Sequence, residues 1–326
     1  MDVLSLFDGI SCGHVALDRA GIAVENYYAS EIEKNPIKVT QNNYPNTIQI
    51  GDVTKVSGTD YKNCDLVMGG SPCQGFSIAG KHLNFDDPRS KLFFECLRIL
   101  DKVNPKYFLL ENVKMKQEYK DIISRYLGVE PIEINSNLVS AQNRKRFYWT
   151  NIPDVTPPKD KGIMLNEILE TEVDEKYYIS TDRTIEICNI EAKRGKIAYI
   201  GADSQGQRVY TIHDKSATIS ALGGGWGAKT GLYWIPCLTP DRLIQRQNGP
   251  RFKPSNAKFY TLTAQDRHGV MVHGQIRKLT PLECERLQTL PDNYTKFDGL
   301  TDGNRIKGIG NGWTVDVIAH ILSFMK

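Results

Sequence analysis

The first 150 residues alternate short apolar runs with segments of helical spacing, and this alternation constrains the fold more than any other feature of the sequence. The apolar runs cover residues 3–7, 26–30, 47–50, 65–68, 107–111, 131–135 and 147–150. The segments between them with helical character cover residues 14–20, 35–43, 90–103 and 116–127. Strands that alternate with helices predict an α/β domain with a largely parallel sheet.

The pattern changes after residue 151. Residues 165–278 lack a helical period and contain glycine turns, as in LGGGWGAKTG (222–231), which predicts an irregular β-rich domain. Thr280, Pro281 and Glu283 then provide a helix cap, a first helical residue and a capping box. A further amphipathic helix is expected over 315–325. We therefore expect a catalytic and cofactor-binding domain at 1–155, an inserted domain at 156–275, and helices completing the first domain at 276–326.

Composition excludes several classes of protein. With 40% hydrophobic and 24% charged residues, the chain is typical of a soluble globular protein. None of its apolar runs approaches the ~20 residues of a membrane span, and MDVLSLFDG suits a first strand better than a signal peptide. The seven cysteines contain no CxxC pair, so we expect neither a metal site nor a disulfide framework. A cytoplasmic location is the expectation.

Charge is unevenly distributed, although the net charge is only +3. Residues 242–278 hold eight Lys and Arg residues and one acid, Asp266. A basic stretch of this kind either contacts nucleic acid or forms a solvated face, and charge alone leaves both interpretations open.

Polar residues follow the predicted strands at the edge where open α/β sheets bind ligands. The residues at these strand ends are Asp8 and Gly9, Glu31, Asp52, Pro72 to Gln74, and Glu111 with Asn112. The turn with Gly9 and Gly13 lacks the GxGxxG pattern of dinucleotide sites. An acid such as Glu31 suits ribose hydroxyls, Asp52 suits an exocyclic amine, and Phe7 offers a stacking face. A nucleoside without phosphates fits, and S-adenosylmethionine is the obvious candidate.

The other half of this predicted site joins Cys73 and Glu111. A thiolate attacks electron-poor carbon atoms, and a neighbouring carboxylic acid protonates or hydrogen-bonds a ring nitrogen as charge develops there. The pair suits attack on a pyrimidine ring. Cys73 as a buried structural thiol, and Glu111 as a buried acid paired with Arg144 or Arg146, are the alternatives.

These residues stand in motifs that follow one another in a known order. The motifs are FDGISCG (7–13), Glu31, GDV (51–53), GGSPCQGFS (69–77), ENV (111–113), QNRKR (142–146), RKLTPLECERLQTLP (277–291) and GNGW (310–313). Through them the chain resembles the DNA cytosine methyltransferases that modify carbon 5. Its first half is especially similar to the animal de novo enzymes and their bacterial and phage relatives. Ser11 replaces a usual glycine, and Gly312–Trp313 departs from many members, but no catalytic side chain is lost.

The resemblance implies a Rossmann-like methyltransferase fold and a role for each motif residue. Cys73, preceded by Pro72, attacks carbon 6 of a cytosine, Glu111 contacts ring nitrogen 3 and the amine, and Arg146 holds the carbonyl oxygen, with Arg144 and Gln142 in support. S-adenosylmethionine then gives its methyl group to carbon 5. The implied cofactor contacts are Phe7, Asp8, Gly9, Ile10, Ser11, Glu31, Ile32, Asp52, Val53, Pro72, Asn311, Gly312 and Trp313.

The implied partner is duplex DNA, from which the target base must be flipped. Residues 74–90 are expected to close over the DNA, and the inserted domain to read its sequence. The expected DNA contacts are Gln74, Ser77, Arg89, Arg242, Arg246, Gln247, Asn248, Arg251, Lys253, Thr261 and Arg267. A cognate restriction endonuclease, a phage role and an orphan role stay open as settings, and a monomer is favoured.

Three other interpretations share these motifs. An RNA cytosine methyltransferase would keep Cys73 and Glu111, although the sizeable inserted region favours DNA. A non-catalytic DNA-binding regulator on the same fold would be expected to lack one of them. A nucleotide-binding enzyme with a structural Cys73 would have an inert thiol at neutral pH.

Overall fold

The structure is a computed structural model, and the part of the chain that it describes excludes several segments. The described residues are 1–71, 88–184, 198–199, 208–209, 235–242, 250–253, 257–264, 268–272 and 275–325. Pro72 and Cys73, with the loop that follows them, lie outside the described residues, as does much of the inserted region.

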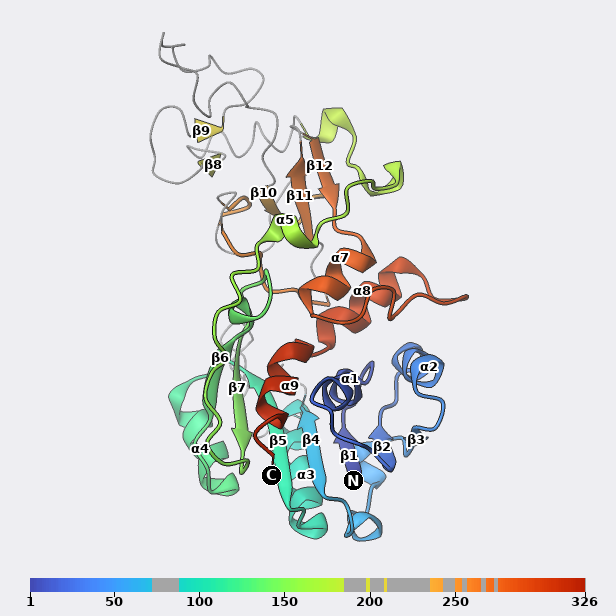
Figure 1. The fold of residues 1–326 in the computed structure, drawn as a ribbon, viewed down its shortest axis with the longest axis vertical. Coiled ribbons are helices and arrows are strands. Elements are labelled where there is room, and N and C mark those ends of the chain that lie inside the picture. Colours follow the sequence, from blue (N-terminus) through green and yellow to red (C-terminus); the bar gives the residue numbers. More distant parts are fainter. Residues whose placement is uncertain are drawn as a thin grey trace.

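A seven-stranded mixed sheet forms the lower part of the molecule (Figure 1). Its strands are β1 (Asp2–Leu6), β2 (Asn26–Ser30), β3 (Ile48–Gln49), β4 (Leu66–Gly70), β5 (Tyr107–Val113), β6 (Ile132–Asn135) and β7 (Lys145–Thr150). Their order is β3-β2-β1-β4-β5-β7-β6. The first five in this order run parallel, while β7 is antiparallel to both of its neighbours. The predicted mostly parallel sheet is therefore confirmed.

Helices cover both faces of this sheet because side chains along each strand alternate between the faces. Leu66 and Met68 pack into one core cluster with the helices α1 (Cys12–Arg19) and α9 (Val315–Leu322). Val67, between them, packs into the opposite cluster with α3 (Pro88–Val103). The remaining helices of this part are α2 (Lys34–Asn43) and α4 (Gln117–Leu127). Strands β1, β4 and β5 are buried almost throughout, as expected of strands covered on both sides, whereas Ile48 of the edge strand β3 is exposed.

A second, smaller sheet lies in the upper part of Figure 1. It is antiparallel, with the order β10 (Ile235–Leu238), β11 (His268–Val272) and β12 (Gln275–Lys278). The short helix α5 (Leu165–Ile168) precedes it, and β8 (Ala198–Tyr199) pairs with β9 (Arg208–Val209). Among the described residues, the inserted region thus has the predicted β character, and β12 continues three residues past the expected boundary at 275.

Two helices connect the small sheet to the large one: α7 (Pro281–Leu287) and α8 (Asp302–Asn311). The predicted capping box of α7 is present, because the Thr280 side chain accepts from the Glu283 amide and Glu283 accepts from the Thr280 amide. The Glu283 carboxylate also accepts two hydrogen bonds, at 2.6 and 2.8 Å, from the guanidinium of Arg277 on β12. Both side chains are at most 1% exposed, so a buried ion pair fastens the small sheet to α7.

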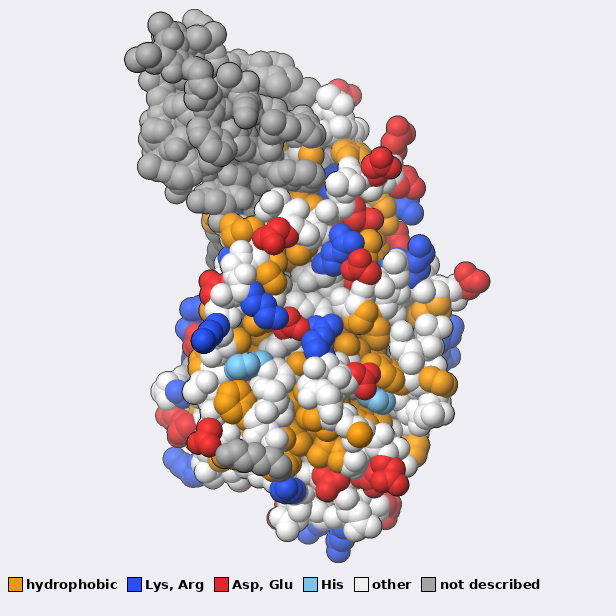
Figure 2. Space-filling view, in the orientation of Figure 1, with side chains coloured by type: hydrophobic (Ala, Val, Ile, Leu, Met, Phe, Trp, Pro, Cys, Tyr) orange, Lys and Arg blue, Asp and Glu red, His pale blue; other side chains and the backbone are white. Residues whose placement is uncertain are grey.

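Charges of both signs are interspersed on the face shown in Figure 2, including the band between the two sheets. No helix in the described ranges has the length and apolar character needed to cross a membrane. The same ranges contain no cluster of His, Cys, Asp and Glu side chains that could hold a metal ion.

Candidate active site

The predicted cofactor turn follows β1 and has an unusual backbone. Phe7, Gly9 and Ser11 all adopt positive φ angles, of 55°, 61° and 56°. A serine with positive φ is strained relative to glycine, but its hydroxyl is paired with the Asp8 carboxylate and, at 2.8 Å, with the Thr40 hydroxyl. These contacts explain how Ser11 occupies a position where the related motif has glycine.

Glu31 lies at the end of β2 and is held against this turn. One of its oxygens accepts from the Gly9 amide at 2.9 Å, and the other accepts from the Ile32 and Glu33 amides at 2.7 and 2.8 Å. Ile32, the next residue, is 70% exposed. An exposed apolar side chain beside a fixed carboxylate fits a ligand with one apolar ring and one hydroxyl-bearing ring.

Two of the predicted cofactor residues have buried side chains. Ile10 is 1% exposed and packs in the core with α1 and α9, while Val53 is 5% exposed and packs on the other side of the sheet. These side chains pack beneath the turns, and the predicted cofactor contacts of the two residues stay a prediction. Asp52, beside Val53, has a carboxylate that accepts from the amide and hydroxyl of Thr54.

Asp8 accepts hydrogen bonds from the hydroxyls of Ser5, Ser11 and Tyr27 under the cofactor turn. Burial nevertheless raises the pKa of Asp8 from 3.8 to about 6, because desolvation outweighs these hydrogen bonds. Between about pH 4 and pH 6 the Asp8 carboxyl is therefore protonated in the folded protein and ionised in the unfolded chain.

We expect this shift to show in a comparison with Asp8→Asn. As the pH rises from about 4 to about 7, the free energy of unfolding of the wild type should fall relative to that of the variant, by at most about 3 kcal/mol. Urea unfolding at each pH measures the difference. A difference between the two proteins that stays constant over this range would contradict the burial of the Asp8 carboxyl.

Glu111 is the centre of the predicted catalytic half. It lies on β5, and its side chain is only 10% exposed. One carboxylate oxygen accepts from Nε of Arg146 at 2.8 Å, and the other accepts from Nε1 of Trp313 at 3.2 Å. The sequence left open whether Arg144 or Arg146 pairs with Glu111, and the geometry selects Arg146.

The neighbouring strand β4 ends beside Glu111. Gly70 pairs with Glu111 in the sheet register, and Ser71 follows it. The side-chain amide of Asn112 donates to the Ser71 hydroxyl at 3.1 Å. The chain is therefore fixed beside Glu111 immediately before Pro72 and Cys73. Asn112 was noted at this strand end but was not predicted as a site residue.

The side chains of Gln142 and Arg144 are buried and contact neighbouring elements. Gln142 is fully buried and donates to the Leu287 carbonyl at 2.5 Å and to the side-chain carbonyl of Gln288 at 2.9 Å. Arg144, also buried, donates to the carbonyls of Leu262 and Gly312 at 2.7 and 3.0 Å. Burial lowers the pKa of Arg144 to about 10. These side chains join the large sheet to the inserted region and to the C-terminal motif, and their predicted support of the catalytic residues stays a prediction.

The inserted region docks on the same motif through its backbone. The Phe259 amide donates to the Ala141 carbonyl at 2.6 Å, the Asn143 amide donates to the Phe259 carbonyl at 3.0 Å, and the Thr261 hydroxyl donates to the Asn143 carbonyl. Phe259 thus forms an isolated parallel β-bridge with Gln142, and Thr261 adds a side-chain contact to it, while the predicted contact of Thr261 with DNA stays a prediction.

Two basic residues predicted to contact DNA are also structural. Arg251 is 1% exposed and donates to the carbonyls of Thr239 and Arg242 at 3.1 and 2.6 Å. The Lys253 ammonium donates to the carbonyls of Lys258 and Phe259, and burial lowers its pKa. The burial of Arg251 contradicts its predicted DNA contact, whereas Lys253 is half-buried and its predicted DNA contact stays a prediction. Arg242 is exposed and stays a candidate.

Several predicted residues lie outside the described part of the chain. They are Pro72, Cys73, Gln74, Ser77, Arg246, Gln247, Asn248 and Arg267, together with the side chain of Arg89. The expected closure of residues 74–90 over DNA stays a prediction for the same reason.

Gln288 is a residue whose importance the sequence did not indicate. Its side-chain amide donates to the carbonyls of Ile309 and Gly312, and its carbonyl accepts from Gln142 and Thr314. The only sequence signal for this role was that a polar residue directly follows the last residue of α7. Gln288 completes the buried polar network behind the site.

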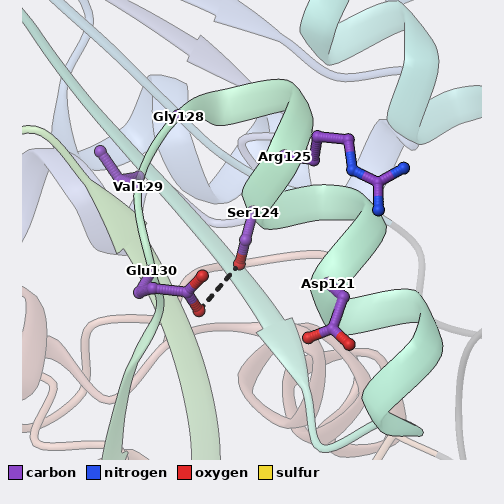
Figure 3. A pocket seen from close by; sticks show the side chains of 6 residues that line it. All are labelled: Asp121, Ser124, Arg125, Gly128, Val129 and Glu130. Atoms are coloured by element: carbon purple, nitrogen blue, oxygen red, sulfur yellow. Dashed lines mark hydrogen bonds between the residues drawn. The ribbon is translucent and has the colours of Figure 1, made fainter.

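A separate pocket of about 320 Å³ lies at the end of α4 (Figure 3). It is lined by Asp121, Ser124, Arg125, Gly128, Val129 and Glu130, none of which is a predicted site residue. The Ser124 hydroxyl donates to Glu130 at 3.3 Å and accepts from the Trp149 indole at 3.1 Å. These polar groups stabilise the turn between α4 and β6.

Comparisons with known proteins agree with the motif order and the fold. The model of the C-5 cytosine-specific DNA methylase family matches residues 1–125 and 133–326. The chain is 30% identical to orphan methyltransferase M.SPRI of Bacillus phage SPR, covering 98% of this chain and 96% of the relative. It is 26% identical to type II methyltransferase M.HhaI of Haemophilus parahaemolyticus, with coverage of 98% and 92%.

A solved structure confirms the fold. The Entamoeba histolytica methyltransferase EhMeth superposes with a TM-score of 0.65 over 99% of this chain and 97% of that one, at 19% identity. The predicted Rossmann-like methyltransferase fold is therefore confirmed. The family model spans nearly the whole chain and both halves of the site. The chain thus belongs to the C-5 cytosine-specific DNA methylase family and is a DNA cytosine-5 methyltransferase.

Proposed function

We propose that this enzyme methylates a flipped cytosine within a specific duplex sequence, through a covalent adduct between Cys73 and carbon 6. The observation that supports this proposal most is the position of Glu111. Its buried carboxylate lies between Arg146 and Trp313, on the strand beside the one that leads into Cys73. A carboxylate and a guanidinium at one strand edge match the polar atoms of a cytosine ring.

Five of the six cysteines other than Cys73 lie among the described residues, and their burial favours Cys73 as the nucleophile, while Cys188 lies outside the described residues. Cys12, Cys64, Cys96, Cys237 and Cys284 are all buried. Burial raises the pKa of Cys12, Cys64 and Cys96 to about 12, and it raises the pKa of Cys284 as well. Thiols with raised pKa values are poor nucleophiles at neutral pH.

In the proposed reaction, the Cys73 thiolate adds to carbon 6 while ring nitrogen 3 gains a proton held by Glu111. Arg146 hydrogen-bonds the ring carbonyl and keeps Glu111 in place. Carbon 5 becomes nucleophilic as a result, and S-adenosylmethionine supplies the methyl group that it takes. Loss of the proton from carbon 5, expulsion of the thiolate and return of the nitrogen-3 proton to Glu111 then restore the aromatic ring.

The turn after β1 and the end of β2 fit S-adenosylmethionine. Glu31 is fixed for ribose hydroxyls, and Ile32 and Phe7 offer apolar surface for an adenine ring. Asp52 is proposed to contact the exocyclic amine, and the loop of Asn311 to Trp313 lies between this turn and Glu111. These residues form the proposed cofactor site.

Duplex DNA is the proposed substrate, bound between the catalytic domain, residues 1–155 with 276–326, and a target-recognition domain over 156–275. The family and the named phage and type II relatives support this assignment. Arg242 is an exposed candidate for DNA contact. The enzyme is proposed to act as a monomer, and a cognate restriction endonuclease stays open as a partner. The first half of the chain is proposed to be most similar to the de novo branch of the family.

Tritiated methyl transfer tests the substrate. Purified enzyme, S-adenosylmethionine with a tritiated methyl group, and unmethylated genomic DNA or total tRNA are incubated in parallel. We expect label in DNA alone, with none for Cys73→Ala. Label in tRNA alone would overturn the DNA assignment and favour the RNA methyltransferase.

A further inference from the structure

Trp313 lies where the C-terminal motif meets the catalytic strand. It follows α8, and its indole packs over Gly70 on β4. A Cβ atom at Gly70 would lie 2.8 Å from the indole nitrogen of Trp313 and 3.0 Å from the Glu111 carboxylate. Because Gly70 has no side chain, the indole reaches Glu111 and donates to it at 3.2 Å.

The two oxygens of Glu111 therefore have separate donors on different elements. Arg146 on β7 donates to one, and Trp313 donates to the other. The terminal torsion of a glutamate side chain is broad and is not set by its rotamer. One donor alone would leave the carboxylate free to turn, whereas two donors fix the plane of the carboxylate.

The backbone on the N-terminal side of Trp313 is itself held firmly. The Gly312 carbonyl accepts from the Arg144 guanidinium at 3.0 Å and from the Gln288 side-chain amide at 3.1 Å. Both donors come from the buried network that joins the sheet to the inserted region. The indole is therefore presented to Glu111 from a fixed support.

We propose that Trp313 is a positioning residue for Glu111, which it acts on through its indole N–H independently of any contact with the cofactor. This inference rests on the proposed function, in which Glu111 faces ring nitrogen 3 during attack by Cys73. A carboxylate turned away from that nitrogen cannot deliver a proton as charge develops there. The indole thus acts before methyl transfer, at the addition step.

The addition step can be measured without a cofactor. When the thiolate adds to carbon 6 and nitrogen 3 gains a proton, carbon 5 can accept a proton from solvent. Loss of the original carbon-5 hydrogen and expulsion of the thiolate then return cytosine. Duplex DNA with tritium at carbon 5 of cytosine therefore releases tritium to water, with no net oxidation or reduction.

The test is tritium release by full-length Trp313→Phe, without cofactor, compared with the wild type. Phenylalanine keeps an aromatic ring and removes the N–H donor. We expect release to fall roughly 10- to 100-fold, the effect of losing one hydrogen bond to a charged group. The dissociation constant of S-adenosylhomocysteine, measured by calorimetry, should change less than about three-fold, since the ring is retained.

Two further variants complete the design. Gly70→Ala adds a Cβ atom that would displace both the indole and the Glu111 carboxylate, and we expect a loss of tritium release at least as large. Trp149→Phe is the matched control, since it removes an indole N–H that bonds Ser124 instead, and its release should equal that of the wild type after correction for folded protein.

Wild-type release from Trp313→Phe would overturn the inference while leaving the proposed function intact. The same holds if Trp313→Phe loses cofactor affinity and methyl transfer but keeps tritium release, because Trp313 would then act only on the cofactor. A wild-type enzyme that methylates DNA and releases no tritium would instead contradict the covalent mechanism itself.

Discussion

Glu111→Gln is expected to lower the turnover number for DNA methylation by roughly 100- to 10,000-fold, the usual contribution of a general acid. Glutamine keeps the size of the side chain and still accepts one hydrogen bond, but it carries no proton for ring nitrogen 3. Its amide also places a donor against the donors of Arg146 and Trp313. Steady-state methyl transfer at saturating cofactor and DNA measures the effect.

Glu133→Gln is the matched control for this prediction. Glu133 lies on the edge strand β6, and its side chain is 39% exposed and 3.6 Å from Lys145. We expect its turnover number to equal that of the wild type. A Glu111→Gln enzyme that stays folded and within ten-fold of the wild type would remove Glu111 from the proposed mechanism.

Arg277→Met is expected to cost about 3–5 kcal/mol in the free energy of unfolding, since it leaves a carboxylate buried without its cation. Glu283 is fully buried and accepts from Arg277 through both oxygens, while also holding the amides of Thr280 and Glu170. Urea unfolding, compared at the transition midpoint, measures the loss.

A second ion pair, between Arg286 of α7 and Asp292, provides the control. Arg286 makes the same two-bond contact with Asp292, at 2.6 and 3.0 Å, but these side chains are 30% and 50% exposed. Solvent screens that pair, so Arg286→Met should cost only about 1 kcal/mol. Equal losses for the two variants would show that burial does not determine the strength of the Arg277 contact.

The sequence predicted the strands and most helices of the large sheet because each has a clear period. NYYAS (26–30) is a strand with the predicted ends, and the capping signal at Thr280 placed the start of α7 correctly. The antiparallel direction of β7 was not predicted, since periodicity does not encode strand direction. The helix α8 was missed because its glycines, such as Gly308 and Gly310, mask the helical pattern.

Within the site, local motifs predicted the residues better than their contacts. The sequence placed Glu111 beside either Arg144 or Arg146, and the structure pairs it with Arg146. The hydrogen-bond partners of Gln142 and Arg144 were not predicted because they lie more than 110 residues away, which no local pattern reports. Arg251 was misassigned because a basic stretch does not distinguish buried guanidinium groups from exposed ones.

Covalent trapping tests the central claim most directly. Duplex DNA with 5-fluorocytosine at the target position is incubated with the enzyme and S-adenosylmethionine, and cross-linked peptides are identified by mass spectrometry. Fluorine at carbon 5 cannot leave as a proton, so the adduct should accumulate. The account predicts a methylated, fluorinated cytosine attached to the peptide that contains Cys73, and no adduct for Cys73→Ala. Efficient methylation of ordinary DNA with no trapped adduct, or an adduct on another cysteine, would contradict it.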